Sequence, residues 1–287
     1  MTTLLLDGCE TVVADALREC SPSAERLGRW DWRMRLDGGA DMEARIRDGR
    51  LCMSVPLDGR KFRPSARSLL KLLTSNSKVP GGGKFVLLQD RSAALRVEIP
   101  LEQDGNLSEQ ILDGYAGLQV TMKRFRAPWT RDSPTREREE EGCDLRQLCG
   151  EAGWPFAERA SGLAVPLEVP GLWYQALLRE DCGEVRAVVT LLEWDRLPDQ
   201  CIRAIAVLLL TAGCFLQMAR PIARSDGATR RYSAGFEVRL PGEPTTMAVD
   251  HALSSLSVGC HSCGREVTAL QDERIAAAYL AIRGWSA

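Results

Sequence analysis

The chain has 287 residues, of which 45% are hydrophobic and 26% are charged, and its formal net charge is −2. This composition excludes a disordered or fibrous protein, and the near-zero charge gives no reason to expect a nucleic-acid or membrane partner. The length allows two domains of ordinary size.

The apolar runs are too short for a leader peptide or a membrane span. Asp7 and Glu10 interrupt the leucines at the N-terminus, and no basic stretch precedes them. The longest apolar segment, residues 204–218, contains polar positions and is shorter than a transmembrane helix. Most of the ten cysteines lie in apolar patterns, where a reduced thiol behaves as a small hydrophobe. We therefore expect a cytoplasmic protein.

The first half of the chain predicts the order helix, three strands, helix, two strands, helix. Apolar residues recur at helical spacing in the expected helices and alternate with polar residues in the expected strands. The helices are expected at 9–20, 65–76 and 107–125, and the strands at 30–36, 42–47, 51–57, 85–89 and 93–101. Asp48 and Gly49 supply the residues of a tight hairpin turn.

The second half predicts a similar order of elements. Its helices are expected at 145–154, 198–218 and from 245 to about 260, and its strands at 162–169, 173–179, 185–192 and 232–240. The second of these helices has six consecutive apolar residues at 205–210, so it must be buried on most sides. A further helix at 269–282 has no counterpart in the first half, and we expect it to pack as a cap.

Four pattern matches that occur in the same order indicate that the chain contains two copies of one structural unit. Residues 50–60 return as 186–196, 72–74 as 209–211, 111 and 118 as 249 and 256, and 95–100 as 236–241. Small changes in spacing are expected if loops changed length after a duplication. We predict an α+β protein with two copies of a helix–three-strand–helix–two-strand–helix unit built on antiparallel sheets. The expected segments are a first copy at 1–130, a charged linker at 131–142, a second copy at 143–268 and a capping helix at 269–287.

The strand pair and helix that end each copy carry a resemblance to a known family. These are residues 85–89, 93–101 and 107–118 in the first copy, and 236–240 and 249–256 in the second. With the order of the other elements, they resemble class I type III secretion chaperones and related bacterial sensory-transduction-regulator domains over nearly the whole of both halves. Members of the family are usually acidic, whereas this chain is nearly neutral.

The resemblance implies an internal pseudo-dimer, because family members are usually single units that dimerise through the second helix. The residues expected at this interface are Leu72 and Leu73 of one helix and Ile205, Leu208 and Leu209 of the other. The chain would then be a monomer that contains both halves of the dimer.

The resemblance also implies protein binding without catalysis or a cofactor. Each unit would hold an extended segment of a client protein in an apolar groove on its sheet and first helix. Trp30, Trp32, Met34 and Trp173 are strand residues that would point outward and contact the client. The alternative is that they fill the core beneath their own sheet, as large apolar residues usually do.

Cys260-His261-Ser262-Cys263 suggests an alternative function. Two thiols at this spacing could form half of a zinc site or a redox pair, which would make the chain a metal- or redox-linked regulator. The sequence has no second C-x-x-C pair, and its other histidine is His251, so we expect the motif to be the end of a helix instead.

Other short motifs give no reason to expect an enzyme. The glycine-rich stretch Pro80–Lys84 leads into an expected strand and lacks the Ser or Thr that follows the lysine of a phosphate-binding loop. The sequence also contains neither G-x-S-x-G nor H-E-x-x-H.

Overall fold

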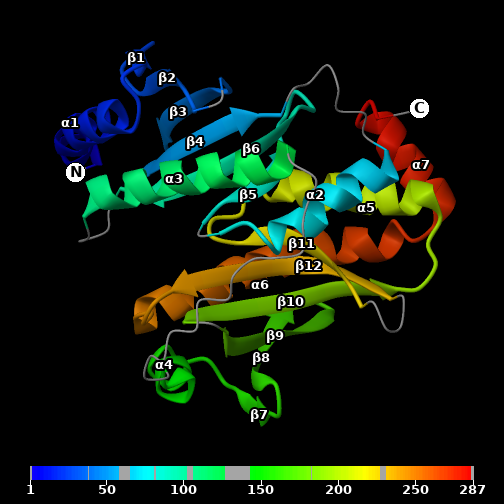
Figure 1. Cartoon of the computed structure of the whole chain (residues 1–287). Coiled ribbons are helices and arrows are strands. Elements are labelled where there is room, and N and C mark those ends of the chain that lie inside the picture. Colours follow the sequence, from blue (N-terminus) through cyan, green and yellow to red (C-terminus); the bar gives the residue numbers. More distant parts are fainter. Residues whose placement is uncertain are drawn as a thin grey trace. The chain divides into compact units, whose positions relative to one another are not determined.

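Contacts divide the chain into two compact units (Figure 1). Unit 1 contains residues 1–62 and 79–131, and unit 2 contains residues 63–78 and 132–287. The computed structural model describes residues 2–37, 39–57, 65–80, 82–101, 106–126, 143–181, 183–226 and 231–285. The predicted linker at 131–142 and the end of the opening repeat match at 58–60 lie outside these residues.

Unit 1 contains a six-stranded antiparallel sheet and two helices that pack against each other. Its elements are α1 (Thr2–Cys20), β1 (Glu25–Arg26), β2 (Asp31–Arg35), β3 (Asp41–Arg47), β4 (Arg50–Pro56), β5 (Lys84–Leu87), β6 (Ala93–Pro100) and α3 (Leu107–Arg126). The strands lie in the order β1-β2-β3-β4-β6-β5, and α3 contacts β6. Asp48 and Gly49 both have positive φ, as the predicted hairpin turn between β3 and β4 requires.

Unit 2 contains a second six-stranded antiparallel sheet. Its elements are α2 (Ala66–Asn76), α4 (Leu145–Glu151), β7 (Ala157–Arg159), β8 (Gly162–Val169), β9 (Leu172–Asp181), β10 (Glu184–Trp194), α5 (Asp199–Ala212), β11 (Arg220–Ser225), β12 (Tyr232–Pro241), α6 (Thr246–Ala269) and α7 (Glu273–Ile282). The strands lie in the order β7-β8-β9-β10-β12-β11. Helix α6 contacts four of them, and α2 contacts β11 (Figure 1).

The two sheets have the same strand order when β1 to β6 are matched with β7 to β12. The predicted α+β fold with two copies of one unit on antiparallel sheets is therefore confirmed. Each sheet also begins with a short edge strand, β1 or β7, that the sequence pattern did not indicate. Two or three residues are too few for an alternating pattern to be recognised.

Three elements of unit 2 depart from the prediction. Strand β11 was not predicted, and the helix expected at 198–218 ends as α5 at Ala212, well before Pro221 of β11. A proline is tolerated there because β11 is an edge strand and does not need every N–H for pairing. Helix α6 continues to Ala269, so residues 260–263 lie inside the helix and not at its end.

The helix pairing expected from the pseudo-dimer lies within unit 2. Helix α2 belongs to the first copy in sequence, yet it packs against α5 of the second copy. All five residues predicted for this interface are buried: Leu72, Leu73, Ile205, Leu208 and Leu209. Residues 204–210 of α5 are buried throughout, which confirms that this apolar helix is covered on most sides. None of the described helices has the length and hydropathy needed to cross a bilayer.

Candidate partner-binding site

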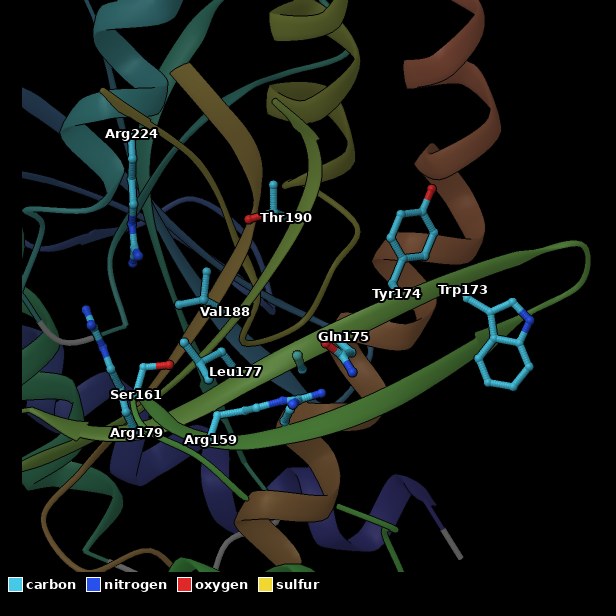
Figure 2. Close-up of a pocket in the computed structure, with 12 residues that line it drawn as sticks. Arg159, Ser161, Trp173, Tyr174, Gln175, Leu177, Arg179, Val188, Thr190 and Arg224 are labelled. Atoms are coloured by element: carbon cyan, nitrogen blue, oxygen red, sulfur yellow. The ribbon is translucent and has the colours of Figure 1, made fainter. Parts of the chain in front are cut away.

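A pocket of about 480 Å³ lies on the sheet of unit 2 (Figure 2). Its lining comes from β7, β8, β9, β10 and β11 and from the β7–β8 turn. Trp173, which the sequence analysis selected as a contact residue, is one of the lining residues. The pocket therefore brings one predicted residue together with residues that are far apart in the sequence.

Strand β9 shows which face of the sheet carries the pocket. Ala176 and Leu178 are buried, and the hydroxyl of Tyr174 on the same face lies close to Gly264 of α6. Side chains alternate between the two faces of a strand, so Trp173 and Arg179 project from the face opposite α6. The Trp173 side chain is 75% exposed, which leaves a large apolar surface in contact with solvent.

Arginines make this pocket electropositive. Arg159, Arg179 and Arg224 all line it, and none of the described lining residues is an Asp or Glu. Arg224 pairs with Glu237 at 2.5 Å, whereas Arg179 is 3.9 Å from Asp181. Figure 2 shows the side chains of Arg179 and Arg224 extending toward one another. Like charges that converge in this way repel each other unless an anion lies between them.

The corresponding face of unit 1 provides an internal comparison. Strand pairing places Asp41, Glu43 and Arg45 of β3 where β9 has Gln175, Leu177 and Arg179. In unit 1, Arg45 pairs with Asp31 at 3.0 Å and with Glu43 at 3.1 Å. The first copy thus neutralises its own charges, whereas the second copy has replaced the acidic residues by uncharged ones.

The structure places the predicted contact residues in three environments. Trp173 is exposed in the pocket, and Trp30 is half-buried with the Arg29 guanidinium 4.7 Å from its ring centre. Trp32 and Met34 are only 3% and 1% exposed. The expectation that these two side chains point outward is therefore wrong, since they face the core of unit 1 as the alternative proposed.

The sequence analysis did not identify the three arginines of the pocket. Arg159, Arg179 and Arg224 belong to three different strands and are up to 65 positions apart in the sequence. Only the strand order and register bring them to one surface. The sequence does contain one indication of this site, which is that acidic residues of the first copy are replaced by uncharged residues in the second. This replacement can be recognised only after the strands of the two copies are aligned.

The cysteine motif lies on α6, away from this pocket. Cys260 and Cys263 are fully buried, whereas His261 between them is exposed. Burial raises the pKa of both thiols to about 12, with Cys263 adding to the effect on Cys260 and Glu266 to that on Cys263. Metal binding and redox exchange require thiolates, which this environment disfavours. In the part of the chain that the structure describes, no group of three or more His, Cys, Asp or Glu residues could hold a metal ion.

The glycine-rich stretch before β5 ends in a structural ion pair. Lys84 is the first residue of β5, is 2% exposed and pairs with Glu98 at 3.2 Å. A lysine held in this way within a sheet is not placed to contact a phosphate.

Comparison with known proteins gives no relative for this arrangement. No protein-family model, curated protein or solved structure matches the chain.

Proposed function

We propose that the chain is a non-enzymatic protein-binding module and that the pocket on the unit 2 sheet holds an extended, acidic segment of a client protein. The observation that carries the proposal is the difference between the copies. The same sheet face has self-neutralised charges in unit 1, whereas in unit 2 it has Trp173, Leu177 and three arginines, of which Arg224 is paired with Glu237.

An extended segment fits the chemistry of this surface. Its side chains point alternately to two sides, so every second residue would face the sheet. Acidic residues of the segment would pair with Arg159 and Arg179, and an apolar residue would cover Trp173. Exposed aromatic residues beside arginines are typical of the residues that contribute most to protein–protein binding.

The proposed contact uses the face of the sheet more than its edge. Strand β7 pairs only with residues 162–164 of β8, so the rest of β8 has no described strand on that side. Pro166 lies in this uncovered part and has no N–H to donate. The edge is therefore a poor template for an added strand, which leaves the pocket side chains to provide affinity and specificity.

The resemblance to class I type III secretion chaperones supports the same proposal, because it implies capture of an extended client segment. Under this proposal the protein acts in the cytoplasm as a monomer, with no cofactor, and its client reaches the pocket as an unfolded stretch.

Fluorescence anisotropy with a labelled peptide in which Glu alternates with Leu tests the proposal. We expect the intact chain to bind this peptide and not its Lys-for-Glu counterpart. Arg179→Gln and Trp173→Ala should each weaken binding about tenfold, the usual scale for central contact residues. Arg45→Gln changes the equivalent arginine in unit 1 and should leave the affinity unchanged.

Two results would contradict the proposal. The first is an affinity that neither pocket substitution alters. The second is tighter binding of an oligodeoxythymidine of equal charge, since bases also stack on tryptophan beside arginine, and this would identify a single-stranded nucleic-acid site.

A further inference from the structure

A second pocket, of about 340 Å³, lies among the helices of unit 2. It is lined by residues of α5, α6 and α7 and of the turns that follow α5 and α7. Among the residues that the structure describes, the first copy contains no counterpart of helix α7. The pocket is therefore an addition to the repeated unit, separate from the sheet pocket described above.

One side of this pocket is apolar and open to solvent. Leu208 and Leu216 form its buried wall, while Phe215 and Val258 are 65% and 55% exposed at its mouth. An apolar molecule in the pocket would remove these exposed surfaces from water, which favours binding by about 25 cal/mol for each Å² covered.

The other side carries a polar group that lacks a partner. The Tyr279 hydroxyl is buried and makes no hydrogen bond within the described part of the chain. Burial raises the pKa of Tyr279, against the opposing charge of Arg283, so the hydroxyl keeps its proton. A buried donor without an acceptor costs about 1–3 kcal/mol, which a ligand oxygen could recover once the Tyr279 ring turns its hydroxyl into the pocket.

Arg283 places a positive charge beside the Tyr279 ring. Its guanidinium lies 5.2 Å from the centre of the Tyr279 ring, and both residues line the pocket. The described residues of the lining include no carboxylate and no second cation. One cation and one donor suit the head group of a singly charged anion.

We propose that this pocket binds a small amphiphile with a carboxylate head and an unbranched apolar body. The carboxylate accepts a hydrogen bond from Tyr279 and pairs with Arg283, and the apolar body lies against Phe215 and Val258. The volume is near the lower end of the range of about 300–1,000 Å³ for ligand sites. It therefore fits a molecule with one short chain and not a two-chain lipid.

Calorimetric titration of the intact chain with decanoate, below the concentration at which it forms micelles, tests this proposal. Decanol has the same chain without the charge, and butyrate has the same head with little chain. We expect decanoate to bind at one site and at least tenfold more tightly than either, because both halves of the molecule contribute.

Substitutions assign the binding to this pocket. Tyr279→Phe removes only the hydroxyl and should weaken decanoate binding about fivefold, and Arg283→Gln should weaken it about tenfold. Arg274→Gln removes an exposed charge on the same helix outside the pocket and should have no effect. Without ligand, Tyr279→Phe should melt at the same temperature as the parent or higher, which separates lost binding from lost folding.

The proposal is overturned if decanoate does not bind at a single site. It is also overturned if decanol binds equally well and Arg283→Gln has no effect, because the pocket would then recognise no head group. Neither result bears on the peptide site, since none of these substitutions lies in the sheet pocket.

Discussion

Buried charges in both units are held in compact ion-pair clusters at corresponding positions. In unit 1, Glu98 pairs with Lys84 at 3.2 Å and with Arg96 at 3.0 Å. In unit 2, Glu237 is fully buried and accepts hydrogen bonds from Arg224 and Arg239 at 2.5 Å. Burial by itself would raise the pKa of Glu237, but the surrounding arginines outweigh it and hold the pKa below its usual value.

The lowered pKa of Glu237 predicts how stability depends on pH. A carboxylate whose pKa is lower in the folded state stabilises the fold above its unfolded pKa, about 4.3, and this contribution disappears as the pH falls through the folded value. Glu237→Gln should therefore lower the free energy of unfolding at pH 7 by about 3 kcal/mol or more, because it leaves buried arginines without their counter-charge. The deficit should shrink as the solution is acidified.

Urea denaturation followed by circular dichroism, at pH 7 and at several acidic values, measures this effect. Glu193→Gln on the exposed face of β10 is the matched control and should behave as the parent does. A Glu237→Gln variant whose deficit stayed constant with pH would show that the carboxylate charge is not what stabilises the cluster.

At single positions, the sequence determined which residues share a face but not which face the helices cover. Trp32 and Trp173 both occupy alternating strand patterns, and one is buried in unit 1 while the other is exposed in the pocket. The outcome depends on which side of the sheet the helices pack against, and strand periodicity carries no information on this. The alternating pattern was enough to identify Trp173 as a candidate contact residue. It gave no reason to select the three arginines around it.

At the scale of the elements, strand register tests which residues of the two copies correspond to each other. Arg50 of β4 pairs with Pro100, and Glu184 of β10 pairs with the corresponding Pro241. Arg50 thus corresponds to Glu184, whereas the sequence match had paired it with Arg186. A shift of two residues keeps every side chain on its own face, so the match preserved the alternation along the two strands although its register was wrong.

The irregular pairing of β10 and β12 predicts one glycine that cannot be replaced. The register shifts between Thr190 and Leu192, opposite Gly235. A Cβ at Gly235 would overlap the carbonyl oxygen of Val189, which is main chain and cannot rotate away. Gly235→Ala should therefore lower the free energy of unfolding by about 2 kcal/mol or more.

Gly150→Ala is the control for this substitution. Gly150 lies in α4, and no atom lies within 4 Å of the position its Cβ would take. This change should raise the stability by up to about 1 kcal/mol, because alanine favours a helix more than glycine does. Equal stability of the Gly235→Ala variant and the parent, in the same denaturation measurement, would show that the β10–β12 bulge can shift to admit a side chain.

On the scale of the whole molecule, the sequence repeats and the compact units differ in one segment. Helix α2 belongs to the first copy by its position in the sequence, but it packs within unit 2. Asn76 at its end donates to the Pro221 carbonyl at 2.7 Å, and Arg239 donates to the Ser77 carbonyl. Arg220 donates to the Asn76 carbonyl at 3.4 Å. The C-terminal end of a helix carries partial negative charge, so two arginines suit this position.

Because α2 packs in unit 2, we predict that the second copy is incomplete without this segment of the first copy. A fragment of residues 132–287 would leave the apolar surface of α5 without α2 and the two arginines without its carbonyls. We expect this fragment to self-associate, because it exposes a large apolar patch. A synthetic peptide of residues 63–78 should bind it and restore a monomer, as measured by light scattering and by the anisotropy of the labelled peptide.

Peptide variants identify what holds α2 in place. Leu72→Asp would bring a charge to a position that is 1% exposed, so it should abolish binding. Asn76→Ala removes the hydrogen bond to Pro221 and should weaken binding about fivefold. Arg67→Gln, on the exposed side of α2, should bind as the parent peptide does. If the fragment were instead a stable monomer that ignored the peptide, α2 would not belong to the core of unit 2, and the second copy would fold from its own sequence alone.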